Sequence, residues 1–247
     1  MNHWTARLVS LAMIAALLLS AAANAAVAQQ TDSGAGTAAE ENALGDSYFF
    51  GDGVEQDYAK AMEHYRNAAE QGYAVAQTTL GYMYTYGLGV EQDDTQAVNW
   101  YQLAAEQGYA VAQFDLGYMY YTGAGVEQSY EQSANWYQLA AEQGNADAIG
   151  ALGSLYEYGE GVAQDYARAA ELYQLSADQG NIFAIISLGV LYEKGRGVEQ
   201  DIDQARSLCQ LAVDLNYEWA VQLLYLAVEA EDSTTAAALL SDLEDAE

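Results

Sequence analysis

The sequence predicts an all-α protein, an α-solenoid of helix–loop–helix repeats that are each 36 residues long. Three observations predict it: the chain repeats itself in register from about residue 38, apolar residues recur at helical spacing, and glycines interrupt them at fixed intervals. The motif Gly-x-Gly-Val occurs at Gly51–Val54, Gly87–Val90, Gly123–Val126, Gly159–Val162 and Gly195–Val198. Leu-Gly recurs in the same register at Leu44-Gly45, Leu80-Gly81, Leu116-Gly117, Leu152-Gly153 and Leu188-Gly189.

The amino terminus has the composition of an export signal. Arg7 ends a short basic segment, residues 8–19 are almost entirely apolar, and small residues follow them. This order predicts a secretory signal peptide over residues 1–25, cleaved after Ala25 or Ala28. We therefore expect a periplasmic or secreted protein.

Two further expectations concern the region before the repeats. Residues 8–28 would nearly span a bilayer, so an uncleaved anchor is the alternative, although alanines make the second half only weakly apolar. We expect no stable membrane insertion once the signal is removed. Residues 26–37 are rich in Ser, Gly, Ala and Gln, which predicts a flexible linker.

Each repeat is predicted to contain two helices joined by a glycine loop. The apolar spacing within Ala74–Tyr86 predicts a first helix, which Gly87 and Gly89 end. Asp93 then supplies a side chain that can cap the amino terminus of the second helix. The equivalent capping positions hold Asp57, Ser129, Asp165 and Asp201.

The second helix of a repeat is predicted to end at a glycine. In the same repeat it runs to about Gln107 and ends at Gly108, because glycine adopts the left-handed conformation at little cost. Five repeats then occupy residues 38–216, and residues 217–247 form a degenerate capping repeat whose last helix covers 232–247. We expect the left-handed conformation also at Gly72, Gly144, Gly180 and Asn216.

These units resemble Sel1-like repeats, which are related to the tetratricopeptide repeat. The resemblance is carried by Leu-Gly-Tyr-Met-Tyr at Leu80–Tyr84, Gly-x-Gly-Val-Glu-Gln-Asp at Gly87–Asp93, and the segment Ala97–Gly108. A tetratricopeptide repeat would have a period of about 34 residues. The family loop usually has proline after Gly-Val, whereas this chain has Glu55, Glu91, Glu127, Ala163 and Glu199. The resemblance implies a right-handed superhelix of helix pairs and a role as adaptor or regulator.

Composition restricts the partners. Lys and Arg number 7 against 36 Asp and Glu, a formal charge of −29. Such a charge repels nucleic acid and anionic lipid, whereas basic proteins remain good partners. A plain solvated coat that keeps the chain soluble is the alternative explanation of the acidity. Cys209 is the only cysteine, which excludes an intramolecular disulfide and a thiolate metal cluster.

The search for catalytic or metal-binding residues leads to no candidate. His64 occupies the register of Trp100, and Cys209 that of Tyr101, so both are predicted to face the core. Gly-x-Gly-Val lacks the further glycine and the Lys-Ser/Thr of a phosphate-binding loop, and Glu-Gln-Asp lacks the oxygen ligands of a calcium loop. We therefore predict no enzyme, no catalytic residue, no cofactor and no metal.

The predicted binding residues lie on the first helices, which line the concave face of stacked helix-pair solenoids. Positions such as Val75, Thr79, Tyr82 and Tyr86 are expected to be free of packing duties. Tyrosines in a groove bury large area and keep a hydroxyl for hydrogen bonding, although each could instead pack between repeats. The predicted partner-binding residues are Tyr82, Tyr86, Asp115, Tyr118, Tyr121, Tyr158 and Phe183.

Taken together, the sequence predicts an exported scaffold or regulatory adaptor that binds a peptide or loop of another protein in a concave groove. The partner is expected to be basic. One alternative is a binder of cell-wall glycans that uses the same tyrosines to stack on sugars. A hydrolase is a weaker alternative, because any histidine-based catalysis would have to depend on His64.

Overall fold

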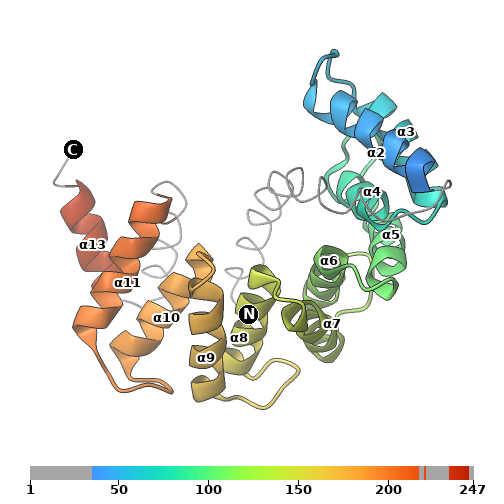
Figure 1. Cartoon of the computed structure of the whole chain (residues 1–247). Helices are drawn as coiled ribbons and strands as arrows, with labels where there is room; N and C mark the ends of the chain where they lie inside the picture. Colours follow the sequence, from blue (N-terminus) through green and yellow to red (C-terminus); the bar gives the residue numbers. More distant parts are fainter. Residues whose placement is uncertain (1–34, 217–219, 221–233, 245–247) are drawn as a thin grey trace. The chain divides into compact units, whose positions relative to one another are not determined.

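A computed structural model describes residues 35–216, 220 and 234–244. The described residues form α-helices joined by short loops and contain no β-strand (Figure 1). They fall into two compact units, one within residues 13–140 and one that contains residues 141–247. The predicted all-α fold of helix–loop–helix repeats is confirmed.

The amino-terminal unit contains successive helix pairs. Neighbouring helices pack in sequence order, α2 on α3, α3 on α4, α4 on α5 and α5 on α6. Its helices are α2 (Ala35–Phe50), α3 (Tyr58–Glu70), α4 (Ala74–Tyr86), α5 (Asp94–Glu106), α6 (Ala110–Thr122) and α7 (Tyr130–Glu142), of which α7 ends just beyond the unit.

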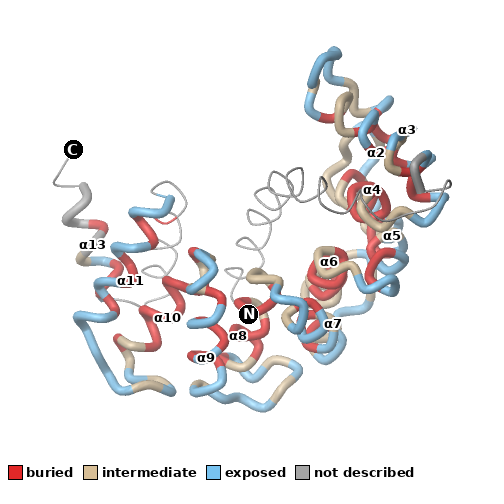
Figure 2. Tube along the Cα trace, viewed as in Figure 1, coloured by how far each residue is buried: buried red, intermediate tan, exposed pale blue. Residues whose placement is uncertain are grey.

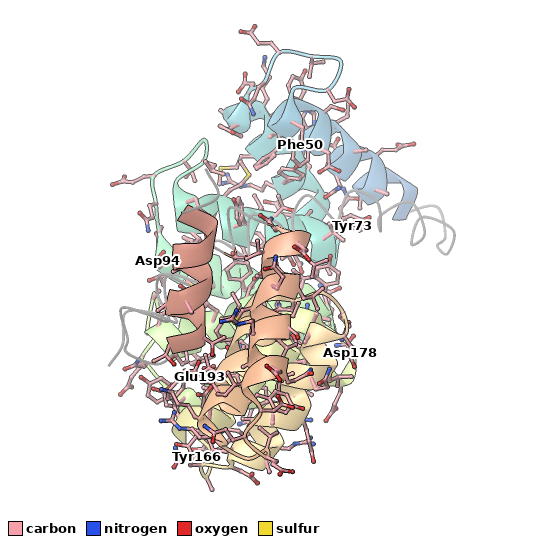
Figure 3. The ribbon with its side chains drawn as sticks, turned by 90° about the vertical axis from the view of Figure 1, so that its left-hand side faces the viewer. Phe50, Tyr73, Asp94, Tyr166, Asp178 and Glu193 are labelled. Carbon is pink, nitrogen blue, oxygen red and sulfur yellow. The ribbon has the colours of Figure 1, made fainter. Side chains whose placement is uncertain are left out.

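The carboxy-terminal unit continues the same pattern and adds a final helix. Here α8 packs on α9, α9 on α10, α10 on α11, and α11 on α13. Its helices are α8 (Ala146–Tyr158), α9 (Tyr166–Ala177), α10 (Ile182–Lys194), α11 (Ile202–Leu215) and α13 (Thr234–Glu244). Figure 3 labels Tyr166 and Asp178 at the two ends of α9.

The predicted caps hold the two ends of the connecting loop. Gly87 follows α4 with φ 66°, the left-handed conformation that ends a helix. Asp93 has an extended backbone, and its carboxylate accepts a hydrogen bond of 3.0 Å from the backbone N–H of Gln96, at the start of α5. Asp57, Asp165 and Asp201 cap their helices in the same way, and Ser129 Oγ accepts from the N–H of Gln132 at 3.3 Å.

The prediction for Asn216 is wrong. Gly72, Gly108, Gly144 and Gly180 do have positive φ values, as expected at the end of a second helix. Asn216, however, is extended, with φ −158°, and its backbone N–H donates to the carbonyl of Ala212. Helix α11 therefore ends without a residue in the left-handed conformation at position 216.

Gly81 of the second repeat and Gly125 of the third allow neighbouring helices and loops to approach closely. In the amino-terminal unit, a Cβ atom on Gly81 would lie 2.6 Å from the ring of Tyr101. A Cβ atom on Gly125 would lie 2.2 Å from the carbonyl oxygen of Asp94, so the loop before α7 rests on the start of α5. Glycine is required at both positions. Figure 2 colours the buried residues of the helices red.

Several predicted features lie outside the described residues. These are the signal peptide over residues 1–25, the linker up to residue 34, and most of the segment 217–233. Helix α2 already begins at Ala35, so the last three residues of the predicted linker are helical. None of the described helices has the length and apolar character needed to cross a bilayer.

Candidate partner-binding surface

The first helices are oriented by four buried tyrosines of the second helices. Tyr65, Tyr101, Tyr137 and Tyr173 are all almost completely buried. Each ring lies against the glycine of a Leu-Gly pair, so this side of each first helix is occupied by packing. In the fifth repeat Cys209 takes the place of the tyrosine.

Four of the predicted residues form one cluster in the amino-terminal unit. The rings of Tyr82 and Tyr86, one turn apart on α4, have their centroids 4.5 Å apart. Tyr118 lies on α6 near Tyr86, and Asp115 lies one turn before Tyr118. We call Tyr82, Tyr86, Asp115 and Tyr118 the tyrosine–aspartate cluster.

The electrostatics of the cluster keep its phenols neutral. Burial raises the pKa of Tyr82 to about 12, and the nearby Tyr86, Tyr58 and Asp115 add to this effect. Burial likewise raises the pKa of Tyr118 to about 12, with a smaller contribution from Tyr86. Both hydroxyls therefore remain protonated at physiological pH and can donate hydrogen bonds.

Asp115 is more deeply placed than predicted. Its exposed fraction is only 6%, whereas the three tyrosines around it are half-buried. Thr79, which occupies the same repeat position on α4, was also expected to be free of packing. It is instead buried, and its hydroxyl donates to the carbonyl oxygen of Val75. Ser187, in the same register of α10, is buried as well.

Tyr121 lies on α6 but faces the following loop and helix. Its ring centroid is 5.3 Å from that of Tyr130, the first residue of α7. Its backbone carbonyl accepts a hydrogen bond of 2.8 Å from Gln128 Nε2. Tyr121 thus helps to hold the loop that leads into α7.

Tyr158 and Phe183 belong to the carboxy-terminal unit, and the structure does not join them to the cluster. Tyr158, the last residue of α8, is 43% exposed. Phe183 is half-buried, and its ring meets that of Tyr173 edge-on at 5.9 Å between centroids. Phe183 is thus partly used for packing.

Sequence reasoning missed a set of carboxylates on the first helices that bind groups of their own chain. Tyr173 donates a hydrogen bond of 2.8 Å to Glu157, and Tyr65 donates one of 2.7 Å to Asp46. Glu193 accepts from the backbone N–H of Thr234 at 2.8 Å and so holds the start of α13, beside which Figure 3 labels it. The sequence does contain a signal for two of these contacts, because Glu157 and Glu193 occupy the repeat position that holds Tyr121 in the third repeat.

His64 and Cys209, the two residues considered for catalysis, are both placed against other groups of the chain. His64 is half-buried, its Nδ1 lies 2.8 Å from Glu41 Oε2, and its ring stacks on Tyr48. Cys209 is buried as predicted, which raises the pKa of its thiol to about 12, with a further contribution from Glu193. Within the parts of the chain that the structure describes, no three His, Cys, Asp or Glu side chains are grouped to hold a metal ion.

Comparison with known proteins identifies the repeats. The family model described as Sel1 repeat matches residues 41–73, 74–109, 110–145, 146–181 and 182–217. No curated protein matches the chain.

Solved structures agree with the family match. A Sel1 repeat protein from Oxalobacter formigenes is 34% identical with a TM-score of 0.72, and the match covers 79% of this chain and 76% of that one. A protective antigen of uropathogenic Escherichia coli strains is 30% identical with a TM-score of 0.59, over 84% of this chain and 56% of that one. An immunity protein from Pseudomonas aeruginosa shares the fold at 24% identity and a TM-score of 0.54, over 81% and 74% of the two chains. The chain belongs to the Sel1 repeat family, whose fold commonly serves as a scaffold for protein–protein interaction.

Proposed function

We propose that this protein is an exported adaptor that binds a basic peptide or loop of another protein at the tyrosine–aspartate cluster. The observation that carries the proposal is the combination of three half-buried tyrosines with a deeply placed carboxylate on neighbouring first helices. Tyrosine combines a large apolar ring with a hydroxyl, which suits it to protein recognition.

The chemistry of the cluster favours a cationic side chain. The faces of Tyr82, Tyr86 and Tyr118 can attract a Lys or Arg head group through their ring quadrupoles. The carboxylate of Asp115, which is buried beside them, adds negative charge when it is ionised. An Arg or Lys at the centre of the bound segment would therefore meet both interactions at once.

The charge of the whole chain supports the same partner class. The net charge is −29, and the sequence contains no Lys or Arg between Arg66 and Arg168, a stretch that includes the entire cluster. A field of this sign accelerates the approach of a basic partner and opposes acidic ones. Binding should therefore weaken as salt concentration rises.

Export is part of the proposal. The order of basic, apolar and small residues over residues 1–25 supports a cleaved signal peptide, with cleavage after Ala25 or Ala28. The partner would then be a periplasmic or secreted protein. Amino-terminal sequencing of the protein recovered from the periplasm would identify the mature end, and an intact Met1 would contradict cleavage.

Site-specific photo-crosslinking tests the docking surface. Benzoylphenylalanine, which is similar to tyrosine in shape, replaces Tyr82 or Tyr118 in cells that export the protein. Tyr84 is the matched control, since it is also a half-buried tyrosine of α4 but its hydroxyl accepts a hydrogen bond from Arg66 at 3.2 Å. We expect a protein adduct at positions 82 and 118 that is absent at 84.

The outcomes separate the candidate functions. Equal adducts at all three positions, or none, would contradict docking at the cluster. Retention of cell-wall glycan fragments that is lost in Tyr118→Ala, without a protein adduct, would instead support the glycan-binding alternative.

A further inference from the structure

A second surface of the amino-terminal unit is formed by leucines on the outside of the second helices. Leu103 of α5 is 47% exposed and Leu139 of α7 is 43% exposed. The two leucines are equivalent in the repeat register. The carboxy-terminal unit has counterparts in Leu175, 51% exposed, and Leu211, 44% exposed.

These leucines point away from the packed face of their helices. On α5 the residues Ala97, Tyr101 and Ala104 are buried, and Leu103 lies between exposed Gln102 and buried Ala104. A single exposed leucine is ordinary on a protein surface. A leucine that recurs at the same outer position of successive helices forms a regular apolar feature.

The loop before α7 is in contact with the start of α5. The loop that leads into α7 rests on the first residue of α5, where Gly125 leaves no room for a Cβ atom against the carbonyl of Asp94. Both helices are 13 residues long and begin at the same point after a glycine loop. The two leucines therefore occupy the same position counted from the start of their helices.

The surroundings of this pair are acidic. Glu106 follows Leu103 by three residues and accepts a hydrogen bond of 2.8 Å from Gln102 Nε2. Glu131 lies in the first turn of α7. Neither α5 nor α7 contains a Lys or Arg.

The counterpart pair in the carboxy-terminal unit differs in charge. Arg168 lies on α9, with its Nη1 2.7 Å from Glu171, and Arg206 lies on α11. The two pairs of leucines are thus alike in exposure and in repeat position. They differ in charge, because every charged residue of α5 and α7 is acidic, whereas α9 and α11 each contain an arginine.

We propose that the outer face of α5 and α7 is a second docking surface, for a cationic amphipathic helix of a partner protein. The apolar face of that helix would cover Leu103 and Leu139, and its Lys or Arg residues would meet the acids of the same unit, which include Glu106 of α5 and Glu131 of α7. A second copy of this chain fits poorly, because two chains of charge −29 repel each other, and anionic lipid is repelled for the same reason. The inference does not depend on the tyrosine–aspartate cluster, which lies on the first helices.

The test compares two double variants. The probe is a fluorescent 18-residue peptide of Lys and Leu with helical amphipathic spacing, and a Lys/Ser peptide of equal charge measures attraction by charge alone. The variants are Leu103→Gln with Leu139→Gln, and, as the matched control, Leu175→Gln with Leu211→Gln. All four side chains are exposed, so both variants should fold, which circular dichroism checks.

We expect the Lys/Leu peptide to bind the Leu103/Leu139 variant about tenfold more weakly than the wild type, because apolar contact area is lost. The control variant and the Lys/Ser peptide should show less than about a twofold change. Equal losses in both variants, or no loss in either, would overturn the proposal. Self-association of the wild type in sedimentation, lost in the Leu103/Leu139 variant, would overturn it in favour of a second copy.

A further variant separates this surface from the proposed function. Tyr82→Ala with Tyr118→Ala should leave binding of the Lys/Leu peptide unchanged while it removes the partner captured at the cluster. Loss of both would mean that the two surfaces are not independent, which contradicts the inference.

Discussion

The two units use the same register position of the first helix in opposite ways. In α4 and α6 of the amino-terminal unit this position holds Tyr82 and Tyr118, which are half-buried and belong to the tyrosine–aspartate cluster, whereas in α2 it holds Asp46. In the carboxy-terminal unit it holds Ser154 and Val190, which are both buried. Repeats with one backbone plan thus offer an aromatic surface in one unit and a closed, packed surface in the other.

A second difference concerns the acids of the first helices. In the carboxy-terminal unit Glu157 accepts from Tyr173, and Glu193 accepts from the start of α13. The equivalent positions of the amino-terminal unit hold Thr85 and Tyr121. The carboxy-terminal unit therefore uses carboxylates at this position to hold its own helices together, including the last one. In the amino-terminal unit the comparable contact is made at another position, where Asp46 accepts from Tyr65.

The contact between glycine and tyrosine changes along the array as well. Gly81 faces the ring of Tyr101, and a Cβ atom there would approach the ring to 2.6 Å. Gly189 faces Cys209, where a Cβ atom would lie 3.4 Å from the sulfur and 3.3 Å from the Ala205 carbonyl oxygen. The glycine is kept in the fifth repeat although its steric requirement is weaker.

Truncation of the residue that faces this glycine should give the largest difference between the units. Tyr101→Ala should lower the free energy of unfolding by about 3–5 kcal/mol, because it empties a fully buried aromatic site. Cys209→Ala should lower it by only about 1 kcal/mol, since a single sulfur is lost. Urea denaturation of the two variants measures the difference, and equal effects would show that the fifth repeat packs like the others.

Substitution of the glycine itself should give an intermediate effect. Gly81→Ala should cost about 1–3 kcal/mol, because the added methyl displaces the Tyr101 ring. Gly189→Ala should stay within about 1 kcal/mol of wild type, since alanine's better helix propensity offsets a mild contact. Thermal unfolding would measure both, and a Gly189→Ala variant as unstable as Gly81→Ala would disprove the assigned cause.

The smallest expected effect is a shift in alkaline behaviour. Because the pKa values of Tyr82 and Tyr118 are raised to about 12 in the folded chain, the protonated phenols favour folding. Their contribution is complete below pH 10, the ordinary tyrosine range, and is lost as pH rises from about 10 towards 12.

Spectrophotometric titration of phenolate absorbance tests this expectation. The double variant Tyr82→Phe with Tyr118→Phe should lose part of the absorbance change near pH 12, while the change near pH 10 stays the same. Loss of absorbance near pH 10 instead would place these phenols in water and contradict the burial of the cluster.

Much of the fold could be predicted because it depends on local chemistry. The bounds of α4, the capping by Asp93 and the left-handed glycines follow from side-chain hydrogen bonding and from backbone sterics within a few residues. Asn216 was mispredicted because asparagine tolerates the left-handed conformation but does not require it.

The binding surface was only partly predictable. A tyrosine has an apolar ring and a polar end, so its register alone does not say whether it packs or faces a partner. Asp115 shows the same difficulty for charge, since its burial depends on the neighbouring tyrosines of other repeats. The outer leucines were missed because the predicted binding residues were confined to the first helices, whereas these leucines lie on the second helices.

Hydrogen–deuterium exchange of the complex with the partner captured at Tyr82 tests the central claim most directly. If the amino-terminal unit carries the docking surface, binding should slow exchange in α4 and α6, over residues 74–86 and 110–122. The first helices of the other unit, over residues 146–158 and 182–194, should exchange as in the free protein. Protection confined to those two helices, with none in α4 and α6, would contradict the account.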